Sequence, residues 1–367
     1  MKKEVRLADI ANRLQVSTVT VSNALAGQKG VSEELRERIK QTAVQMGYQS
    51  RSTAAAPGKR ILTVGVIISE QYLGNYPSFY WKVYQTLAVE GREQSCVLPF
   101  EVLTKEGEKS LTLPLFIHDS KTDGIIIIGE ISSRYLKFLR QETNLPQVYV
   151  DFQKKSLPMN AVLTNNFYGM YQMVNYLIES GHRDIAYVGT VGANNSIMDR
   201  YFGYLKALME AGIPSCPEWV INDRDAEGYL TDIQLPQRMP TAFACNSDLT
   251  ASALIKVLEA KGCRIPEDFS VVGFDNYLYD GLCDIKITSY EVNVREMVKA
   301  ALTDIIRQVW DRSNPLKAGD GSLTEEESQA AAWQRVQIIT GRLVVKDSVR
   351  VLSKQGDDGL AFHDLHI

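Results

Sequence analysis

Several polar side chains stand directly after short apolar runs of the sequence, where they are placed to bind a small molecule. The runs TVGVIIS, QVYVD, TAFACNSD and SVVGFD end in or beside such residues, and an arginine follows the run AYVGT and its loop. A guanidinium among carboxylates and amides suits a ligand rich in hydroxyl groups, because each hydroxyl both donates and accepts hydrogen bonds. The candidate ligand-binding residues of this pattern are Ser69, Asp151, Arg200, Asn246, Asp248 and Asp275.

Some of these candidates have competing structural explanations. Asp248 stands immediately before LTASALIKVLEA, so capping that helix explains it as well as ligand binding does. Phe79 and Tyr80 could stack on a sugar or a base, and a place in the core explains them equally well. Arg200 and Asp275 have weaker structural explanations and are the stronger candidates.

Catalytic and metal-binding patterns are missing from the sequence. It contains no G-x-S-x-G elbow, no G-x-x-x-x-G-K-S/T loop and no H-E-x-x-H, and GTVGAN lacks the lysine of a phosphate loop. The five cysteines show no C-x-x-C spacing, and His363 and His366 offer only two metal ligands near the end of the chain. We therefore expect no enzyme activity, no catalytic residue, no metal and no cofactor.

The elements that position the candidates alternate in type from Ile61 onward. Continuous Val/Ile runs of strand length are separated by amphipathic helices, which indicates parallel sheets buried on both faces. Such a stretch exceeds one usual core, so it predicts two α/β lobes, with ligands bound beyond the carboxyl ends of the strands. The expected helices lie near residues 79–93, 133–143, 168–180, 200–211 and 249–261.

The first 60 residues differ in charge and in pattern. They carry 11 lysines and arginines against 5 aspartates and glutamates, a net charge of +6, whereas the remainder carries 29 against 39. Leu7, Ile10, Ala11 and Leu14 mark one apolar face of a helix, and a second helix begins after Ser32. Between them VSTVTVSNALAG has the composition of a strand, but a lone strand between two helices has no pairing partner. We therefore expect a helix there and, overall, a helix-turn-helix.

The segment RLADIANRLQVSTVTVSNALAGQKGVSEELRERIKQTAVQMGY resembles the DNA-binding domain of the lactose repressor (LacI/GalR) family of bacterial transcription regulators. GHRDIAYVGT, PTAFACNSDLTASALIKVLEAKG, IPEDFSVVGFDN and ITGRLVVKDSV look like the family's effector-binding domain. The resemblance implies an all-α helix-turn-helix head and a two-lobed α/β domain with parallel sheets, similar to periplasmic binding proteins. It places the family's ligand-binding arginine, asparagine and aspartate on Arg200, Asn246 and Asp275, whereas Val294, with Tyr290 nearby, stands where the family often has an aromatic residue.

The resemblance also implies contacts with DNA. A homodimer is expected to place two heads in successive major-groove half-sites of a near-palindromic operator. Asparagine pairs best with adenine, so Asn23 predicts an A·T pair at the base that it contacts. The expected DNA-binding residues are Leu7, Ser17, Thr18, Val19, Thr20, Ser22, Asn23, Lys29 and Arg51.

The connector QSRSTAAAPGKR departs from the family pattern because it has no leucine to wedge into the minor groove. Weaker DNA bending than in leucine-bearing relatives is therefore expected. The predicted domains are a head at 1–48, a hinge at 49–60, an effector-binding and dimerisation domain at 61–350, and a tail at 351–367. Within the effector-binding domain, lobe 1 takes residues 61–160 and 290–325, and lobe 2 takes residues 161–288 and 330–350.

The sequence thus predicts a ligand-responsive transcriptional repressor, with a sugar or sugar derivative as its effector. A sugar-binding sensor that does not regulate DNA is the alternative. With no apolar run of membrane-spanning length and no signal peptide, we expect a cytoplasmic protein without a membrane partner.

Overall fold

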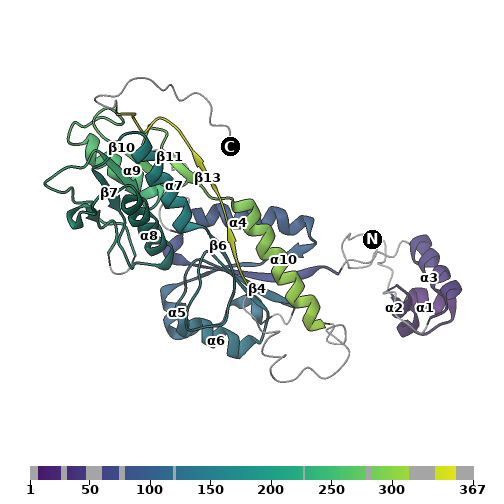
Figure 1. The fold of residues 1–367 in the computed structure, drawn as a ribbon. Helices are drawn as coiled ribbons and strands as arrows, with labels where there is room; N and C mark the ends of the chain where they lie inside the picture. Colours follow the sequence, from purple (N-terminus) through teal and green to yellow (C-terminus); the bar gives the residue numbers. More distant parts are fainter. Residues whose placement is uncertain are drawn as a thin grey trace. The chain divides into compact units, whose positions relative to one another are not determined.

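The computed structural model divides the chain into two units, residues 1–60 and 61–367 (Figure 1). It describes residues 7–25, 31–46, 60–73, 79–118, 121–225, 228–277, 283–313 and 335–352. The predicted hinge contact Arg51, the predicted contact Lys29 and most of the tail lie outside these residues, so the expectations about DNA bending stay predictions.

The first unit contains three helices among its described residues: α1 (Leu7–Leu14), α2 (Thr18–Leu25) and α3 (Glu33–Met46). The strand-like stretch is the helix α2, as predicted, because its Val21 and Ala24 pack with Ile10 and Ile39 and are fully buried. Ser17 caps the helix, since its Oγ accepts a hydrogen bond from the amide of Thr20 at 3.0 Å. Tertiary packing therefore outweighs the strand propensity of the valines and threonines.

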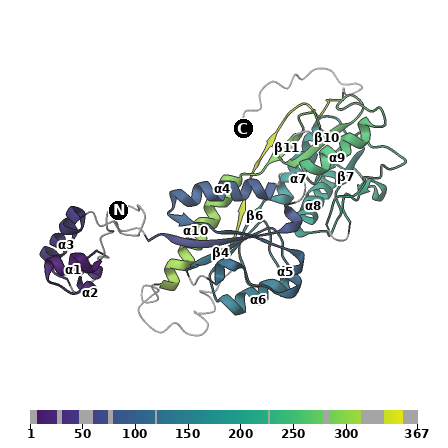
Figure 2. The same ribbon diagram turned by 180° about the vertical axis from the view of Figure 1, so that it is seen from behind.

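The second unit begins with a sheet whose isoleucines are buried on both faces. In β4 (Gly124–Ile128), Ile125 and Ile127 pack with α6 (Ser133–Thr143), and Ile126 and Ile128 pack in the cluster that includes α4 (Phe79–Glu93) and α10 (Val294–Ser313). Figures 1 and 2 show these helices around the sheet. Successive side chains of a strand point to opposite faces, so a continuous apolar run needs helices on both sides. The strand order is β12-β6-β5-β4-β1-β2, with β3 also pairing with β1, and all of these pairs are parallel. The elements are β1 (Leu62–Ser69), α4 (Phe79–Glu93), β2 (Cys96–Val97), β3 (Phe100–Leu103), α5 (Lys105–Ser110), β4 (Gly124–Ile128), α6 (Ser133–Thr143), β5 (Gln147–Val150), β6 (Asn160–Thr164), α10 (Val294–Ser313) and β12 (Val336–Ile339).

The second sheet repeats this arrangement in the order β13-β11-β10-β9-β7-β8. Its pairs are parallel except for β13, which runs antiparallel to β11. The helices α7 and α8 pack together on one face, and α9 packs on the other face of the sheet. The elements are α7 (Asn166–Glu179), β7 (Ile185–Val188), α8 (Asn195–Glu210), β8 (Val220–Ile221), β9 (Ala242–Cys245), α9 (Asp248–Glu259), β10 (Ser270–Asp275), β11 (Thr288–Glu291) and β13 (Arg342–Val344). Three short 3-10 helices, η1 (Glu70–Tyr72), η2 (Leu115–Ile117) and η3 (Pro217–Trp219), complete the described elements.

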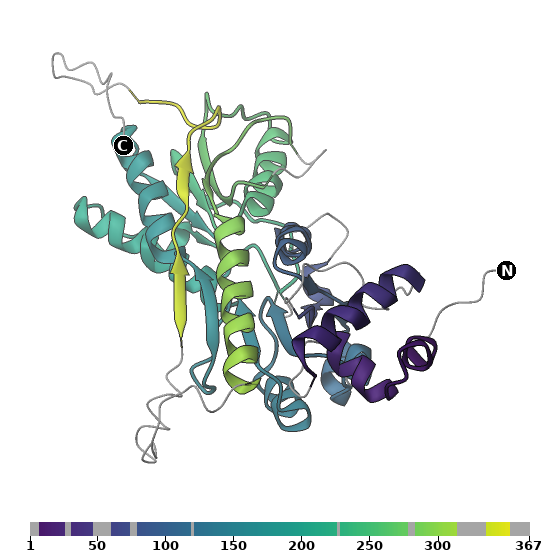
Figure 3. The ribbon, with the colours of Figure 1, turned by 90° about the vertical axis from the view of Figure 1, so that its right-hand side faces the viewer.

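The crossings between the lobes correct the predicted lobe boundaries. Residues 330–350 were expected in lobe 2, but β12 pairs with β6 in the first sheet, and only Thr340 and Gly341 separate it from β13 in the second. The strand β11 also extends to Glu291, past the predicted boundary at 288, and pairs with β10. Figure 3 shows β12 and β13 following one another along the edge of both lobes, beside α10. This late crossing has no local signal, because two adjacent apolar strands look the same in sequence whether they enter one sheet or two.

In the described part of the chain, no helix combines the length and the apolar character needed to cross a membrane.

Candidate functional site: an effector cavity between the lobes

A cavity of about 520 Å³ lies between the two lobes, lined by residues at the carboxyl ends of strands from both sheets. We refer to it as the effector cavity. Its volume is within the usual range for a small-molecule site. Six of the eight predicted ligand-binding residues line it: Phe79, Tyr80, Asp151, Arg200, Asn246 and Asp275.

Arg200 is held rigidly in the wall of this cavity. It lies in the second turn of α8, not at the start of the helix as predicted, because Asn194 caps the helix by accepting a hydrogen bond from the amide of Ile197 at 2.8 Å. The Arg200 Nε donates to Asn166 Oδ1 at 2.8 Å, and one terminal nitrogen donates to the Asn246 carbonyl at 2.5 Å. Its guanidinium carbon lies 3.8 Å from the centre of the Phe274 ring. The guanidinium is therefore preorganised before any ligand arrives.

Two aspartates reach the cavity from corresponding strands of the two sheets. Asp151 follows β5 and Asp275 ends β10, and each strand is the third in its sheet's order. Both residues are buried and have left-handed backbones, with φ of 67° and 99°. Such backbone strain in non-glycine residues is typical of functional sites.

Burial raises the pKa of both aspartate carboxyls in the cavity. Burial raises the pKa of Asp275 to about 7, although Arg200, 3.5 Å away, opposes the shift. Burial also raises the pKa of Asp151, again opposed by Arg200. The Tyr80 hydroxyl donates to Asp151 Oδ2 at 2.9 Å, and Oδ1 of the same carboxyl is buried with no hydrogen-bond partner among the described residues.

An aromatic wall stands beside these carboxyls. The ring centres of Tyr72 and Tyr80 lie 4.5 Å apart, and those of Phe79 and Tyr80 lie 5.5 Å apart. The Tyr72 hydroxyl donates to the Glu130 carbonyl and accepts from the Glu130 amide, which fixes its ring. Burial raises the pKa of both tyrosines. Tyr72, which lies in the 3-10 helix η1 directly after the first strand, was not among the predicted ligand-binding residues.

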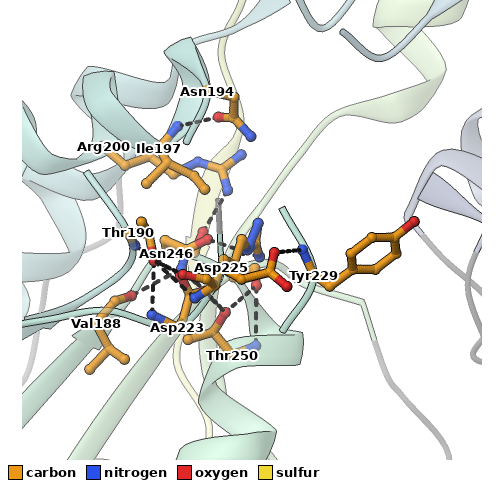
Figure 4. A network of polar contacts seen from close by, with 12 residues as sticks. Val188, Thr190, Asn194, Ile197, Arg200, Asp223, Asp225, Tyr229, Asn246 and Thr250 are labelled. Carbon is orange, nitrogen blue, oxygen red and sulfur yellow. Dashed lines mark hydrogen bonds and ion pairs between the residues drawn. The ribbon is translucent and has the colours of Figure 1, made fainter. Parts of the chain in front are cut away.

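A network of hydrogen bonds holds the Asn246 side chain in place (Figure 4). The side-chain nitrogen (Nδ2) of Asn246 donates to the Val188 carbonyl at 3.0 Å and to Asp223 Oδ2 at 2.7 Å. The same carboxylate accepts from the Thr250 hydroxyl at 2.6 Å and lies 3.3 Å from the Arg224 Nε. Arg224 also lines the cavity but was not predicted from the sequence, because β8, the strand before it, has only two residues and forms no recognisable apolar run.

Two predicted ligand-binding residues do not line the cavity. Ser69 is buried at the end of β1, and Asp248 is buried where it accepts a hydrogen bond from the Tyr277 amide at 2.8 Å. Ser247, not Asp248, caps α9. Val294 packs in the core, and the Tyr290 hydroxyl accepts a hydrogen bond from the Gly341 amide at 2.6 Å, so neither lines the cavity.

The head exposes most of the residues that were predicted to contact DNA around α2. Ser17, Thr18, Val19 and Ser22 are exposed, with 65% of Val19 accessible. Thr20 and Asn23 are half-buried, as is Leu7, which packs against the head's core. An exposed valine on a short helix is available to contact a thymine methyl group.

No group of three or more histidine, cysteine or acidic side chains in the described ranges is arranged to hold a metal ion.

This chain belongs to the lacI family of bacterial regulatory proteins. The family model for their DNA-binding domain matches residues 6–50, and the model of a periplasmic-binding-protein-like domain matches residues 174–349. The resemblance and the fold class stated from the sequence are therefore confirmed. The chain is a transcriptional repressor of this family with an effector-binding domain.

Individual relatives agree with this assignment and are repressors rather than enzymes. The chain is 30% identical over 281 residues, 74% of this chain and 80% of the relative, to the HTH-type transcriptional repressor PurR of Pectobacterium carotovorum. It is 31% identical over 281 residues, with the same coverage, to PurR of Photorhabdus laumondii.

Solved structures share the fold. A lac repressor dimer bound to operator and an anti-inducer matches with a TM-score of 0.65 at 20% identity, covering 95% of this chain and all of that one. A complex of the transcriptional regulator CelR with cellobiose matches with a TM-score of 0.59 at 23% identity, covering 94% of this chain and all of that one.

Proposed function

We propose that a sugar or sugar derivative, bound in the effector cavity, controls the affinity of this repressor for its operator. The observation that carries the proposal is that Asp151 and Asp275, one from each lobe, line the same cavity as Arg200. A polyhydroxylated ligand can donate hydroxyl protons to both carboxylates and accept from the guanidinium at once. Such a ligand favours the closed arrangement of the lobes, because only that arrangement satisfies both lobes' groups.

A purine base is the second candidate. The relatives named PurR suggest it, and the wall formed by Tyr72, Phe79 and Tyr80 offers aromatic surface on which a planar base can stack. The density of charged and hydroxyl-bearing groups on the other walls favours the sugar, because a base leaves more of these groups without partners. The similarity to a CelR regulator in complex with cellobiose gives further support to a sugar.

On the DNA side, we propose a homodimer whose two α2 helices read the half-sites of a near-palindromic operator in the cytoplasm. Thr18, Val19 and Asn23 are the residues proposed to contact bases, and the neighbouring Ser17 and Thr20 are proposed to contact DNA beside them. The exposure of Val19 and the basic charge of residues 1–60 support this arrangement.

A thermal-shift screen of the intact chain tests the ligand class. A ligand at about 100 times its dissociation constant stabilises the folded state by about 2.7 kcal/mol, which raises the melting temperature by several degrees. We expect such shifts with one or more sugars. A screen in which purine bases raise the melting temperature and no sugar does would exclude the sugar.

Removal of residues 1–60 tests the link to DNA. We expect the shortened chain to keep the thermal shift with the ligand and to lose retention on operator DNA. If the intact chain gave no sequence-specific footprint near its own gene, the sensor alternative would replace the regulator.

A further inference from the structure

A second cavity, of about 460 Å³, lies where the chain crosses between the lobes, and it shares no lining residue with the effector cavity. Its walls come from α4, from the crossing that follows β11, and from the crossing between β12 and β13. The volume is sufficient for a small organic molecule. We refer to it as the hinge cavity.

The hinge cavity carries an excess of positive charge. Three cations line it, Lys82, Arg295 and Arg342, together with the single carboxylate Glu291. Arg342 Nε pairs with Glu291 and Arg295 Nε pairs with Glu90, both at 2.6 Å. Lys82 has no carboxylate within ion-pair distance in the described part of the chain. Of the three cations, Lys82 is therefore the one without a carboxylate partner among the described residues.

The two arginines also keep hydrogen-bonding capacity. Each makes its described contact through Nε, and the terminal nitrogens of Arg295 and Arg342 make no hydrogen bond within the described ranges. A guanidinium with free terminal nitrogens can bind two oxygens of a phosphoryl group side by side, which gives geometric specificity as well as energy.

Contacts connect this cavity to the effector cavity. Glu291 accepts a hydrogen bond from the side-chain nitrogen (Nδ2) of Asn276 at 3.2 Å, and Asn276 directly follows Asp275. Burial has the largest effect on the pKa of Asp275 and of Glu291, and Lys82 is close enough to lower both values. The pKa of Asp275 is raised overall, whereas that of Glu291 is lowered overall, mainly because Arg342 and Asn276 donate hydrogen bonds to it. An anion that neutralises Lys82 weakens its field at Asp275, so the two cavities are electrostatically coupled.

The geometry points to the hinge cavity as a binding site for a small organic phosphate, which acts as a second effector. The phosphoryl group contacts Lys82, Arg295 and Arg342, and the remainder of the molecule fills the space beside the two crossings. Because the segments that line this cavity join the two lobes, we expect a ligand seated between them to favour one arrangement of the lobes. By reciprocity, the organic phosphate and the effector then change each other's affinity by the same factor.

Calorimetric titration of the intact protein tests this site with three probes: glucose 6-phosphate, ribose 5-phosphate and adenosine monophosphate. We expect at least one to bind, and inorganic phosphate to compete with it because the phosphoryl group is the shared feature. Lys82→Gln and Arg342→Gln should each weaken binding about tenfold or more, since each removes a charge-assisted contact. The matched control is Lys299→Gln, because Lys299 lies on α10, pairs with Glu296 and does not line the cavity.

A second variant separates the hinge cavity from the effector cavity. Arg200→Met disables the effector cavity, and we expect it to bind the organic phosphate within about twofold of the unaltered protein. Loss of phosphate binding in a folded Arg200→Met protein would assign the phosphate to the effector cavity and overturn the proposal. Failure of all three probes to bind, an equal loss in Lys299→Gln, or no competition by inorganic phosphate would also overturn it.

Discussion

Replacing Asp275 by asparagine removes a buried carboxyl group whose ionisation opposes folding. In the folded protein the pKa of Asp275 is about 7, against 3.8 for an unperturbed aspartate, because burial disfavours the charged form. The folded state therefore holds this proton to a higher pH than the unfolded state does. It follows that the contribution of Asp275 to stability falls as the pH rises from about 4 to about 7, and stays low above that.

The size of the effect follows from the shift. About three pKa units, at 1.36 kcal/mol each, give a cost on the order of 4 kcal/mol once the carboxyl is fully ionised. About 2.5 kcal/mol of this cost develops between pH 5 and pH 8. Asparagine cannot ionise, so the stability of Asp275→Asn relative to the unaltered protein should rise by about 2.5 kcal/mol over this interval. The lost ion pair with Arg200, at 3.5 Å, works in the opposite direction at high pH and reduces the gain.

Urea unfolding followed by tryptophan fluorescence measures this difference. All four tryptophans lie beyond residue 60, so the signal reports the effector-binding unit of the intact chain. The matched control is Asp284→Asn, because Asp284 is exposed in the same lobe. If Asp275→Asn and the unaltered protein had the same dependence on pH from 5 to 8, the raised pKa and the reasoning from it would be wrong.

Three further changes test the head and the aromatic wall. Asn23→Arg should shift the preferred base toward G·C by about 1 to 3 kcal/mol, measured by selection of operator sequences; an unchanged preference would exclude a base contact by Asn23. Ser17→Ala removes the cap of α2 and costs about 1 kcal/mol, so amides of that helix should exchange with solvent about fivefold faster, while exchange in the second unit stays the same. If the amides of α2 exchanged at the same rate in Ser17→Ala as in the unaltered protein, the cap would not stabilise the helix. Tyr80→Phe leaves the Asp151 carboxyl without its hydroxyl donor and should destabilise the second unit by about 1 to 3 kcal/mol in urea unfolding; no loss of stability would mean that water replaces the hydroxyl.

The alternation of strands and helices could be predicted from the sequence because its signal is local. Continuous runs such as Ile125–Ile128 must be buried on both faces, and the rule that ligands bind at the carboxyl ends of parallel strands then identifies Asp151, Asn246 and Asp275. The helix α2 was predictable for a different reason, since a strand at Val21 would have had no partner.

The features that could not be predicted depend on the direction of individual side chains and on contacts between residues far apart in the sequence. The strand-end rule gives the edge of a sheet but not the direction of each side chain, so Ser69 and Asp248 were chosen although neither lines the cavity. Arg224 was missed because its loop gains its position from Asp223 and Asn246, which are brought together only by tertiary structure. The start of α8 was misplaced although Asn194 could have been recognised as a cap.

The matching positions of Asp151 and Asp275 have a consequence for ligand design. Each lobe supplies one carboxyl, at the end of the strand that is third in the order of its sheet. A small ligand can therefore contact the carboxyl of one lobe without contacting that of the other. Under the proposed function, we expect a truncated molecule that reaches only one aspartate to compete for the cavity without favouring closure of the lobes, and so to act as an antagonist. Under the proposed function, we expect a full response only from a molecule that spans both carboxyls, so the distance between its two donor groups should matter more than its total affinity.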